Sequence, residues 1–365
     1  MCTKDYCRPR RDWACGAAAG WDSFARKDGQ QEMKALVTGG AGFIGSHVTR
    51  VLLERGAQVT VLDDLSGGFA ENVPSGATFV KGSVTNSALV EQLCAANQFD
   101  YVFHLAAYAA EGLSHFIREF NYTNNVVGSM TVINACVRHK VKCLIFTSSI
   151  AVYGANQVPM LEDTVPAPED PYGIAKYGVE MDLAAARRMF GLNYLIFRPH
   201  NVYGENQNIG DRYRNVIGIF MSQIMRGEPL TVFGDGEQQR AFSHIDDVAP
   251  PMVEAALTPS SWNEVYNIGA DIPYSVNQLV AMIGEAFGRT PRVDYQPARE
   301  EVKVAYSSHD KIRKAVRCAP PVPFAEGIRR MAEWAKIHGP RKGEVFTSVE
   351  IRENLPPIWA ADLRD

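Results

Sequence analysis

Short apolar runs alternate with amphipathic stretches between Lys34 and Phe197. Short apolar runs bounded by turn residues predict buried strands, and apolar positions three or four residues apart predict helices. The runs predict strands over residues 34–38, 59–62, 77–81, 101–105, 143–147 and 194–197. The helical spacing predicts helices from Phe43, over 87–96, over 122–137 and from Pro171. This alternation predicts an α/β fold, with a doubly wound parallel sheet and right-handed crossovers.

The pattern changes after Arg198, where long polar loops such as 206–214 begin. A smaller C-terminal α/β lobe is therefore expected beside the first domain. Its expected elements are a helix near 216–225, a strand over 230–233, segments 240–244 and 265–268 that return to the main sheet, an irregular region over 291–316, and a last helix over 325–337. The predicted organisation is a disordered N-terminal extension (1–32), a first domain (33–198, with returns near 240–270), a smaller lobe (mainly 199–340) and a C-terminal tail (341–365).

Three glycines follow the first predicted strand. Gly39 allows a sharp turn, Gly42 allows the backbone to approach a pyrophosphate, and Gly45 allows the next helix to pack closely on the strand. The N-terminus of that helix offers free N–H groups and a positive dipole end to phosphates. Asp63 ends the second predicted strand, at the distance where a carboxylate holds an adenosine ribose. We therefore expect a Rossmann-type domain that binds NAD, because Asp63 would repel the 2′-phosphate of NADP.

Composition narrows the function classes further. The 365 residues carry a formal charge of −4, so no basic field argues for nucleic acid or an anionic membrane as a partner. No apolar stretch approaches the roughly 20 residues that span a bilayer. The seven cysteines are scattered without paired metal-ligand spacing. We therefore expect no metal site, and a reducing, cytoplasmic location.

A second motif begins at Asp170, which can cap a helix that starts with Pro171. Tyr172 and Lys176 are four residues apart and share one face of that helix. A nearby ammonium and the positive end of the helix are expected to lower the pKa of the phenol, which would make Tyr172 a general base. Ser149 follows the fifth predicted strand and could hydrogen-bond the reacting oxygen. Lys176 could also bind the nicotinamide ribose.

Together these motifs resemble the extended short-chain dehydrogenase/reductase family, in its epimerase/dehydratase group, and most of all its UDP-glucose 4-epimerases. The resemblance covers residues 33–337. It rests on Thr38-Gly39-x-x-Gly42-x-x-Gly45, Asp63, His104-Leu105-Ala106-Ala107, Asn124-Asn125, Ser149, Tyr172-x-x-x-Lys176, the segment from Arg198 to Gly204 and the segment from Arg240 to Asp247.

The resemblance implies two sets of binding residues. The cofactor set is Gly39, Gly42, Phe43, Ile44, Gly45, Asp63, Ser83, Val84, Leu105, Ala106, Ala107, Asn124 and Lys176. The substrate set is Ser149, Tyr172, Asn201, Arg240, Arg299 and Ala305, in which the two arginines resemble a diphosphate clamp. One departure concerns adenine: the family usually has an aspartate after Gly82, and Ser83 accepts a hydrogen bond more weakly.

The residues after Ser149 help to sort the reactions of this family. Related dehydratases need an acidic pair there, and Ile150 and Ala151 cannot move protons. The expected activity is an NAD-dependent 4-epimerisation of a nucleotide sugar, UDP-glucose or UDP-galactose, by transient oxidation at C4. By resemblance, Ala305 stands where hexose-only epimerases often have a bulky tyrosine, which implies that N-acetylhexosamines are also accepted. Another nucleotide-sugar reaction of the family and a non-catalytic NAD sensor stay open as alternatives. The resemblance further implies a homodimer through helices near 124–137 and 172–189.

Overall fold

The computed structural model describes residues 32–155, 157–211, 213–298, 303–340, 346 and 348–360. Within these ranges, a seven-stranded sheet has the order β11-β6-β5-β4-β1-β2-β3, and all neighbouring strands are parallel. The expected doubly wound sheet is therefore confirmed. Its strands are β1 (Lys34–Thr38), β2 (Gln58–Asp63), β3 (Thr78–Lys81), β4 (Tyr101–His104), β5 (Cys143–Thr147), β6 (Tyr194–Pro199) and β11 (Glu264–Ile268).

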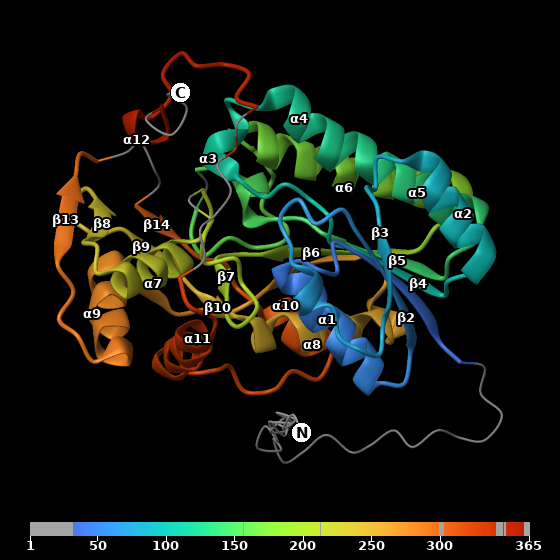
Figure 1. Cartoon of the computed structure of the whole chain (residues 1–365). Coiled ribbons are helices and arrows are strands. Elements are labelled where there is room, and N and C mark those ends of the chain that lie inside the picture. The colour runs from blue at the N-terminus through green and yellow to red at the C-terminus, as the bar shows by residue number, and fades with distance from the viewer. Residues whose placement is uncertain are drawn as a thin grey trace, which may run out of the picture. The chain divides into compact units, whose positions relative to one another are not determined.

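Helices cover both faces of this sheet (Figure 1). Side chains alternate along β1, so Ala35 and Val37 pack with the helices on one face, while Leu36 packs with those on the other. The first face carries α1 (Phe43–Glu54), α8 (Ala249–Ala256) and α10 (Asp310–Ala315). The second face carries α2 (Ser87–Asn97), α5 (Gly128–Arg138) and α6 (Pro171–Phe190).

The helix expected over 122–137 begins earlier and is not uniform. It starts as α4 (Arg118–Tyr122), continues as a π-helical segment (Thr123–Val127) and becomes α5. A π-helical segment is typical of functional positions, and this one contains Asn124. The short helix α3 (Glu111–Ser114) precedes it. Single 3-10 turns are η1 (Ala70–Asn72), η3 (Ile150–Tyr153), η4 (Ile245–Asp247) and η5 (Pro259–Ser261).

The smaller lobe is built on short sheets and three helices with a shared apolar core. Strand β8 (Leu230–Phe233) pairs with β13 (Val293–Gln296), and β7 (Val202–Tyr203) pairs with β10 (Ser243–His244). The central strand β9 (Gln239–Ala241) lies between β12 (Pro273–Ser275) and β14 (Val304–Ala305). The helices are α7 (Val216–Arg226), α9 (Val276–Phe287) and α11 (Phe324–His338), and a short helix, α12 (Pro357–Ala360), follows later in the chain.

Two expectations about this part of the chain were wrong. Of the segments expected to return to the main sheet, Glu264–Ile268 does so beside β6, but 240–244 forms parts of β9 and β10 in the small sheets. A strand covered by helices on both faces must be apolar, and Gln239 and Arg240 do not meet that requirement. The region 291–316 is also less irregular than expected, since it contains β13, β14 and α10.

Several expectations fall on residues outside the described ranges. The N-terminal extension lies almost wholly outside them, as do Arg299 and part of the C-terminal tail. The part of the tail that is described, Phe346 and residues 348–360, lies beside α3 and α4 (Figure 1). No helix among the described residues is long and apolar enough to cross a membrane.

Candidate active site

A cavity of about 460 Å³ lies beyond the carboxyl ends of the central strands. Ligands of doubly wound sheets bind at this edge, next to the point where the strand order reverses, which here is between β1 and β4. Most of the predicted site residues meet in its wall. They are Gly39, Gly42, Phe43, Ile44, Gly45, Asp63, Ser83, Val84, Leu105, Ala106, Ala107, Asn124, Ser149, Tyr172, Lys176 and Asn201.

The glycine turn fits a pyrophosphate. Gly39 has a φ of +72°, and a Cβ on it would lie 2.7 Å from the backbone nitrogen of Ala106. A Cβ on Gly45 would lie 2.1 Å from the carbonyl oxygen of Gly39, so both positions require glycine. Helix α1 begins after Gly42 without a capping side chain. Its N-terminus therefore keeps backbone N–H groups for an anionic ligand at the cavity wall.

Asp63 is held in place by the same turn. One of its carboxylate oxygens accepts from Ala41 N over 3.0 Å, and the other accepts from Leu65 N over 2.8 Å. Burial raises the pKa of Asp63, and these two N–H groups oppose the rise. Each oxygen keeps a lone pair, which suits the two hydroxyl groups of a ribose.

Ser83 lines the cavity where the family usually has an aspartate. Its hydroxyl lies 2.9 Å from the Thr85 hydroxyl and accepts from Thr85 N over 3.2 Å. The side chain is thus engaged by its own turn, which weakens it further as a partner for adenine.

Helix α6 positions the catalytic candidates at the other end of the cavity. Asp170 caps the helix by accepting from Gly173 N over 2.9 Å, and Pro171 occupies the first turn, as the sequence predicted. Tyr172 and Lys176 then face the cavity from one side of the helix. Ser149 lies two residues beyond the end of β5 and caps η3 by accepting from Ala151 N over 3.1 Å.

Lys176 is fixed by main-chain and aromatic contacts. Its Nζ donates to the carbonyl oxygen of Thr147 over 2.7 Å. The same atom lies 4.8 Å from the centre of the Phe146 ring and 5.7 Å from that of Tyr172. These contacts hold the amine between the end of β5 and the phenol.

The pKa of the phenol departs from the sequence-based expectation. Burial raises the pKa of Tyr172, although a hydrogen bond with Ser149 opposes the rise. Burial also lowers the pKa of Lys176 to about 7, against an opposing effect of the Glu180 carboxylate. In the protein without a cofactor, desolvation raises the pKa of the phenol by more than the helix N-terminus and the Lys176 amine lower it. The expected lowering of the phenol pKa therefore needs further positive charge in the cavity, which an oxidised nicotinamide carries.

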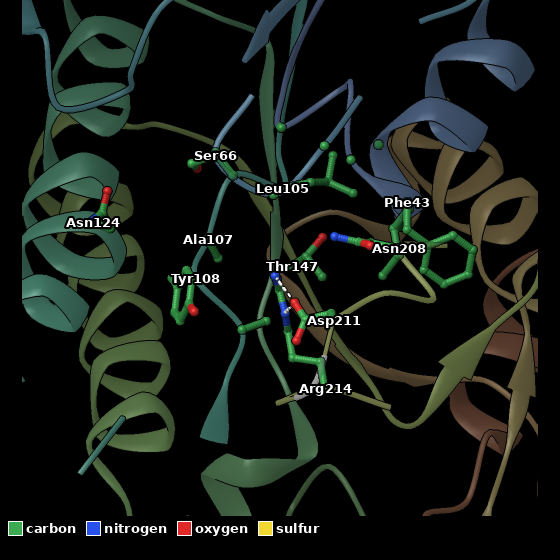
Figure 2. Close-up of a pocket in the computed structure, with 18 of the residues that line it drawn as sticks. Phe43, Ser66, Leu105, Ala107, Tyr108, Asn124, Thr147, Asn208, Asp211 and Arg214 are labelled. Carbon is green, nitrogen blue, oxygen red and sulfur yellow. Dashed lines mark hydrogen bonds and ion pairs between the residues drawn. The ribbon is translucent and has the colours of Figure 1, made fainter. Parts of the chain in front are cut away.

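A polar loop supplies wall residues that the sequence did not single out. Asp211 accepts from Arg214 Nε over 2.6 Å, and Figure 2 shows this ion pair in the cavity. The Arg214 guanidinium carbon lies 5.1 Å from the centre of the Tyr108 ring, which is a cation–π distance. Glu111, at the start of α3, also lines the cavity. The polar stretch 206–214 was the only sequence signal for Asp211 and Arg214, and Tyr108 and Glu111 had none.

Only some of the predicted substrate residues line the cavity. Asn201 lines the cavity and donates to the Ala241 carbonyl over 3.1 Å. Arg240 and Ala305 are not among the described residues of the cavity wall. Arg240 donates to the carbonyl groups of Gln239 and Lys303, over 2.9 and 3.3 Å. Arg299 lies outside the described ranges, so the expected pair of arginines is not seen together.

Ala305 lies behind the wall and not in it. It is 9% exposed and packs in a cluster with Val152, Tyr153 and Met160, next to η3. Its influence on a ligand would therefore act through the segment that follows Ser149. Within the described ranges, no group of three or more His, Cys, Asp or Glu side chains could hold a metal ion.

Comparisons with known proteins agree with this arrangement. The sequence model of the NAD dependent epimerase/dehydratase family matches residues 35–269. A putative UDP-glucose 4-epimerase of Methanocaldococcus jannaschii is 34% identical, over 82% of this chain and 98% of its own length. The crystal structure of a Thermotoga maritima UDP-glucose 4-epimerase with UDP-glucose is 36% identical and has a TM-score of 0.80, covering 84% of this chain and 99% of its own.

A UDP-N-acetylglucosamine 4-epimerase of Methanobrevibacter ruminantium M1, in complex with UDP-N-acetylmuramic acid, is similar as well. It is 30% identical with a TM-score of 0.80, covering 85% of this chain and 100% of its own. These matches confirm the resemblance drawn from the motifs and the expectation of NAD as the cofactor. The chain belongs to the NAD dependent epimerase/dehydratase family.

Proposed function

We propose that this protein is an NAD-dependent nucleotide-sugar 4-epimerase. One observation carries the proposal: Ser149, Tyr172 and Lys176 meet at one end of a cavity whose other end is the glycine turn with Asp63. A dinucleotide that spans the cavity would place its redox end beside a phenol and a serine hydroxyl. Relatives of similar length that are named for this reaction support the assignment.

Different residues of the chain would hold different parts of the cofactor. The glycine turn and the start of α1 would hold the pyrophosphate, Asp63 the adenosine ribose, and Lys176 the nicotinamide ribose. When bound, NAD supplies a reversible hydride acceptor next to the sugar. A cofactor that is regenerated in each turnover does not have to be exchanged, so we expect it to stay bound through purification.

Side chains of the protein would carry out the proton transfers. Tyr172 would take the proton of the C4 hydroxyl as the carbon is oxidised, and return it when the 4-keto sugar is reduced on its other face. Ser149 would hold the C4 oxygen against the phenol. Lys176, held by Thr147, would add positive charge on the phenol side of the cavity when it is protonated. No other acid–base pair is needed for a reaction that begins and ends at one carbon.

The residues that follow Ser149 argue against a dehydratase. Dehydration requires acidic groups that move protons at neighbouring carbons, and Ile150 and Ala151 occupy the positions after Ser149. In the structure they form the first turn of η3 and carry no titratable group. An epimerisation that uses only Tyr172 is the reaction that this set of side chains fits.

UDP-glucose and UDP-galactose are the substrates we propose first. The similarity to a structure that contains UDP-glucose supports this choice. The UDP-N-acetylhexosamines are proposed as further substrates, which the similarity to a UDP-N-acetylglucosamine 4-epimerase supports. Ala305 lies behind the cavity wall and would influence sugar size only through the segment that follows Ser149.

A homodimer belongs to the same proposal. Val127, Ile174 and Met181 are large apolar side chains on the helices expected to form the interface, and each is exposed in the single chain. A buried helix–helix interface would remove them from water. Sedimentation of the wild-type protein and a Met181→Glu variant tests this: we expect a dimer for the first and a shift toward monomer for the second.

The direct test of function is an assay of UDP-galactose conversion to UDP-glucose without added cofactor. We expect turnover by the wild-type protein and a loss of about 10²- to 10⁴-fold in Tyr172→Phe, which removes only the hydroxyl. The alternative of a non-catalytic NAD sensor predicts retained NAD without turnover of either sugar nucleotide by the wild-type protein. A Tyr172→Phe variant as active as the wild type would contradict the proposed role of the phenol.

A further inference from the structure

The C-terminal part of the chain is fastened to the region between α3 and α4. The Glu350 carboxylate accepts from the backbone nitrogens of Glu119 and Phe120, over 2.8 Å each. The backbone nitrogens of Glu350 and Ile351 in turn donate to the Phe116 carbonyl, over 2.9 and 3.2 Å. A carboxylate that receives two N–H groups at a helix start is a charge-assisted anchor. This fastening therefore joins residues more than two hundred positions apart.

On one side of this anchor, Phe346 contacts the aromatic wall of the cavity. Its ring centre lies 4.9 Å from that of Phe120 and 5.4 Å from that of Tyr108. Phe120 and Tyr108 line the cavity and contact each other edge to face at 5.1 Å. Phe346 thus supports two residues of the wall from behind.

On the other side of the anchor, Trp359 supports a second segment of the cavity wall from behind. It is 9% exposed, and its ring centre lies 5.4 Å from that of Tyr213. The indole also packs on Gly112, where an added Cβ would lie 3.4 Å from the ring. Tyr213 and Gly112 both line the cavity, one in the polar loop 206–215 and the other in α3.

The supported wall is the one that faces the phenol. Arg214 follows Tyr213 and stacks on Tyr108, and its charge lowers the pKa of Tyr172. Glu111 precedes Gly112, and its charge raises the same pKa. Both groups line the cavity together with Tyr172, and the Ser114 hydroxyl of α3 accepts from the Tyr172 backbone nitrogen over 3.2 Å. The C-terminal segment therefore backs the end of the cavity where the reaction is proposed to occur.

We propose that Phe346 and residues 348–360 form a C-terminal strap that positions the sugar of the nucleotide-sugar substrate. The strap holds α3 and the 206–215 loop at a fixed separation, so that the sugar and its 4-keto form stay against Tyr172 while the ring turns over. The inference rests on the proposed function, and Trp359 is a positioning residue.

Steady-state kinetics of Trp359→Ala, Trp359→Phe and Glu350→Gln in the full chain test the strap. We expect Trp359→Ala to raise the KM for UDP-galactose about two- to tenfold, the range that corresponds to one lost aromatic contact. A loosened wall should also let the 4-keto sugar escape, which leaves reduced nicotinamide on the protein as a growing near-ultraviolet absorbance. Trp359→Phe keeps a ring and should restore most of the wild-type behaviour. Glu350→Gln should also raise KM, by a smaller factor. It tests the strap independently if Trp359→Ala does not fold.

A matched control and an independent readout separate the strap from general stability and from the proposed function. Trp334→Ala removes an indole on α11 that stacks on His338, and it should lower stability without raising KM or accumulating reduced cofactor. Amide hydrogen exchange should be faster in Trp359→Ala than in wild type in both 108–120 and 206–215, and unchanged in α9. Equal effects of the Trp334 and Trp359 variants on KM, or unchanged exchange in either wall segment, would overturn the strap. If the wild-type protein epimerises no sugar nucleotide, the proposed function fails and the exchange result alone decides whether the strap restrains both segments.

Discussion

Lys176 Nζ donates to the carbonyl oxygen of Thr147 over 2.7 Å, where α6 crosses the end of β5. Burial lowers the pKa of this amine to about 7, whereas the same amine in an unfolded chain keeps a value near 10.5. Between these two values the unfolded chain binds the proton that the folded protein releases. Stability should therefore rise with pH across this window, since the unfolded state binds more protons.

The pH dependence of unfolding checks this statement when the wild-type protein is compared with Lys176→Met. We expect the wild type to gain stability relative to the variant as the pH rises from about 7 toward 10.5. Other groups that titrate in this window are shared by both proteins and cancel in the difference. A constant difference in unfolding free energy across the window would show that Lys176 keeps an ordinary pKa in the folded protein.

Glu180 and Arg198 form a buried ion pair that fastens α6 to β6. Arg198 donates to the two carboxylate oxygens over 3.0 and 2.5 Å, and both side chains are about 5% exposed or less. Glu180→Ala leaves a buried guanidinium without its partner and should lower the free energy of unfolding by about 3–5 kcal/mol. Chemical denaturation measures this loss. Replacing both residues with apolar ones, as in Glu180→Leu with Arg198→Met, should cost less than the single change, and an additive double variant would contradict the pairing.

Glu111 and Arg214 act on the Tyr172 phenol with opposite signs. Burial is the main cause of the raised phenol pKa, the Glu111 charge adds to it, and the Arg214 charge opposes it. If Tyr172 is the base, the rate rises with pH through the pKa of the phenol. Arg214→Gln should therefore move this limb of the pH–rate profile to higher pH, and Glu111→Gln should move it to lower pH. Shifts in the same direction for the two variants would exclude this electrostatic account.

Ala305 offers a test of the sugar-size hypothesis. Because it packs behind η3 with Val152 and Met160, a tyrosine there must displace its neighbours, at a typical cost of about 1–3 kcal/mol. We expect Ala305→Tyr to lower thermal stability and to slow UDP-N-acetylglucosamine more than UDP-glucose, since the displaced segment follows Ser149. Unchanged rates on both sugar nucleotides would rule out any influence of this position on sugar choice.

The parts of the site that the sequence predicted are those defined by local spacing. Gly45 is required by its close approach to Gly39 within one strand–turn–helix unit, and Tyr172 and Lys176 share a helix face because they are four residues apart. Such relations need no knowledge of the rest of the fold. The parallel, doubly wound character of the sheet followed in the same way from alternating strands and helices.

What the sequence did not predict depends on contacts between distant segments. Arg214 enters the cavity because its loop folds over Tyr108, and a non-periodic polar loop carries no sign of that contact. Trp359 packs on Gly112 and Tyr213 from the far end of the chain. The raised pKa of Tyr172 was missed for a different reason, because the sequence shows the neighbouring amine but not the degree of burial.

The fate of the hydrogen at C4 tests the central claim most directly. UDP-galactose that carries deuterium at C4 is incubated with the purified protein in ordinary water, without added cofactor, and the product is analysed by mass spectrometry and NMR. Oxidation and re-reduction inside one cavity predict UDP-glucose that keeps its deuterium at C4, with formation lost in Tyr172→Phe. UDP-glucose with solvent hydrogen at C4, or no UDP-glucose from the wild-type protein, would contradict the account.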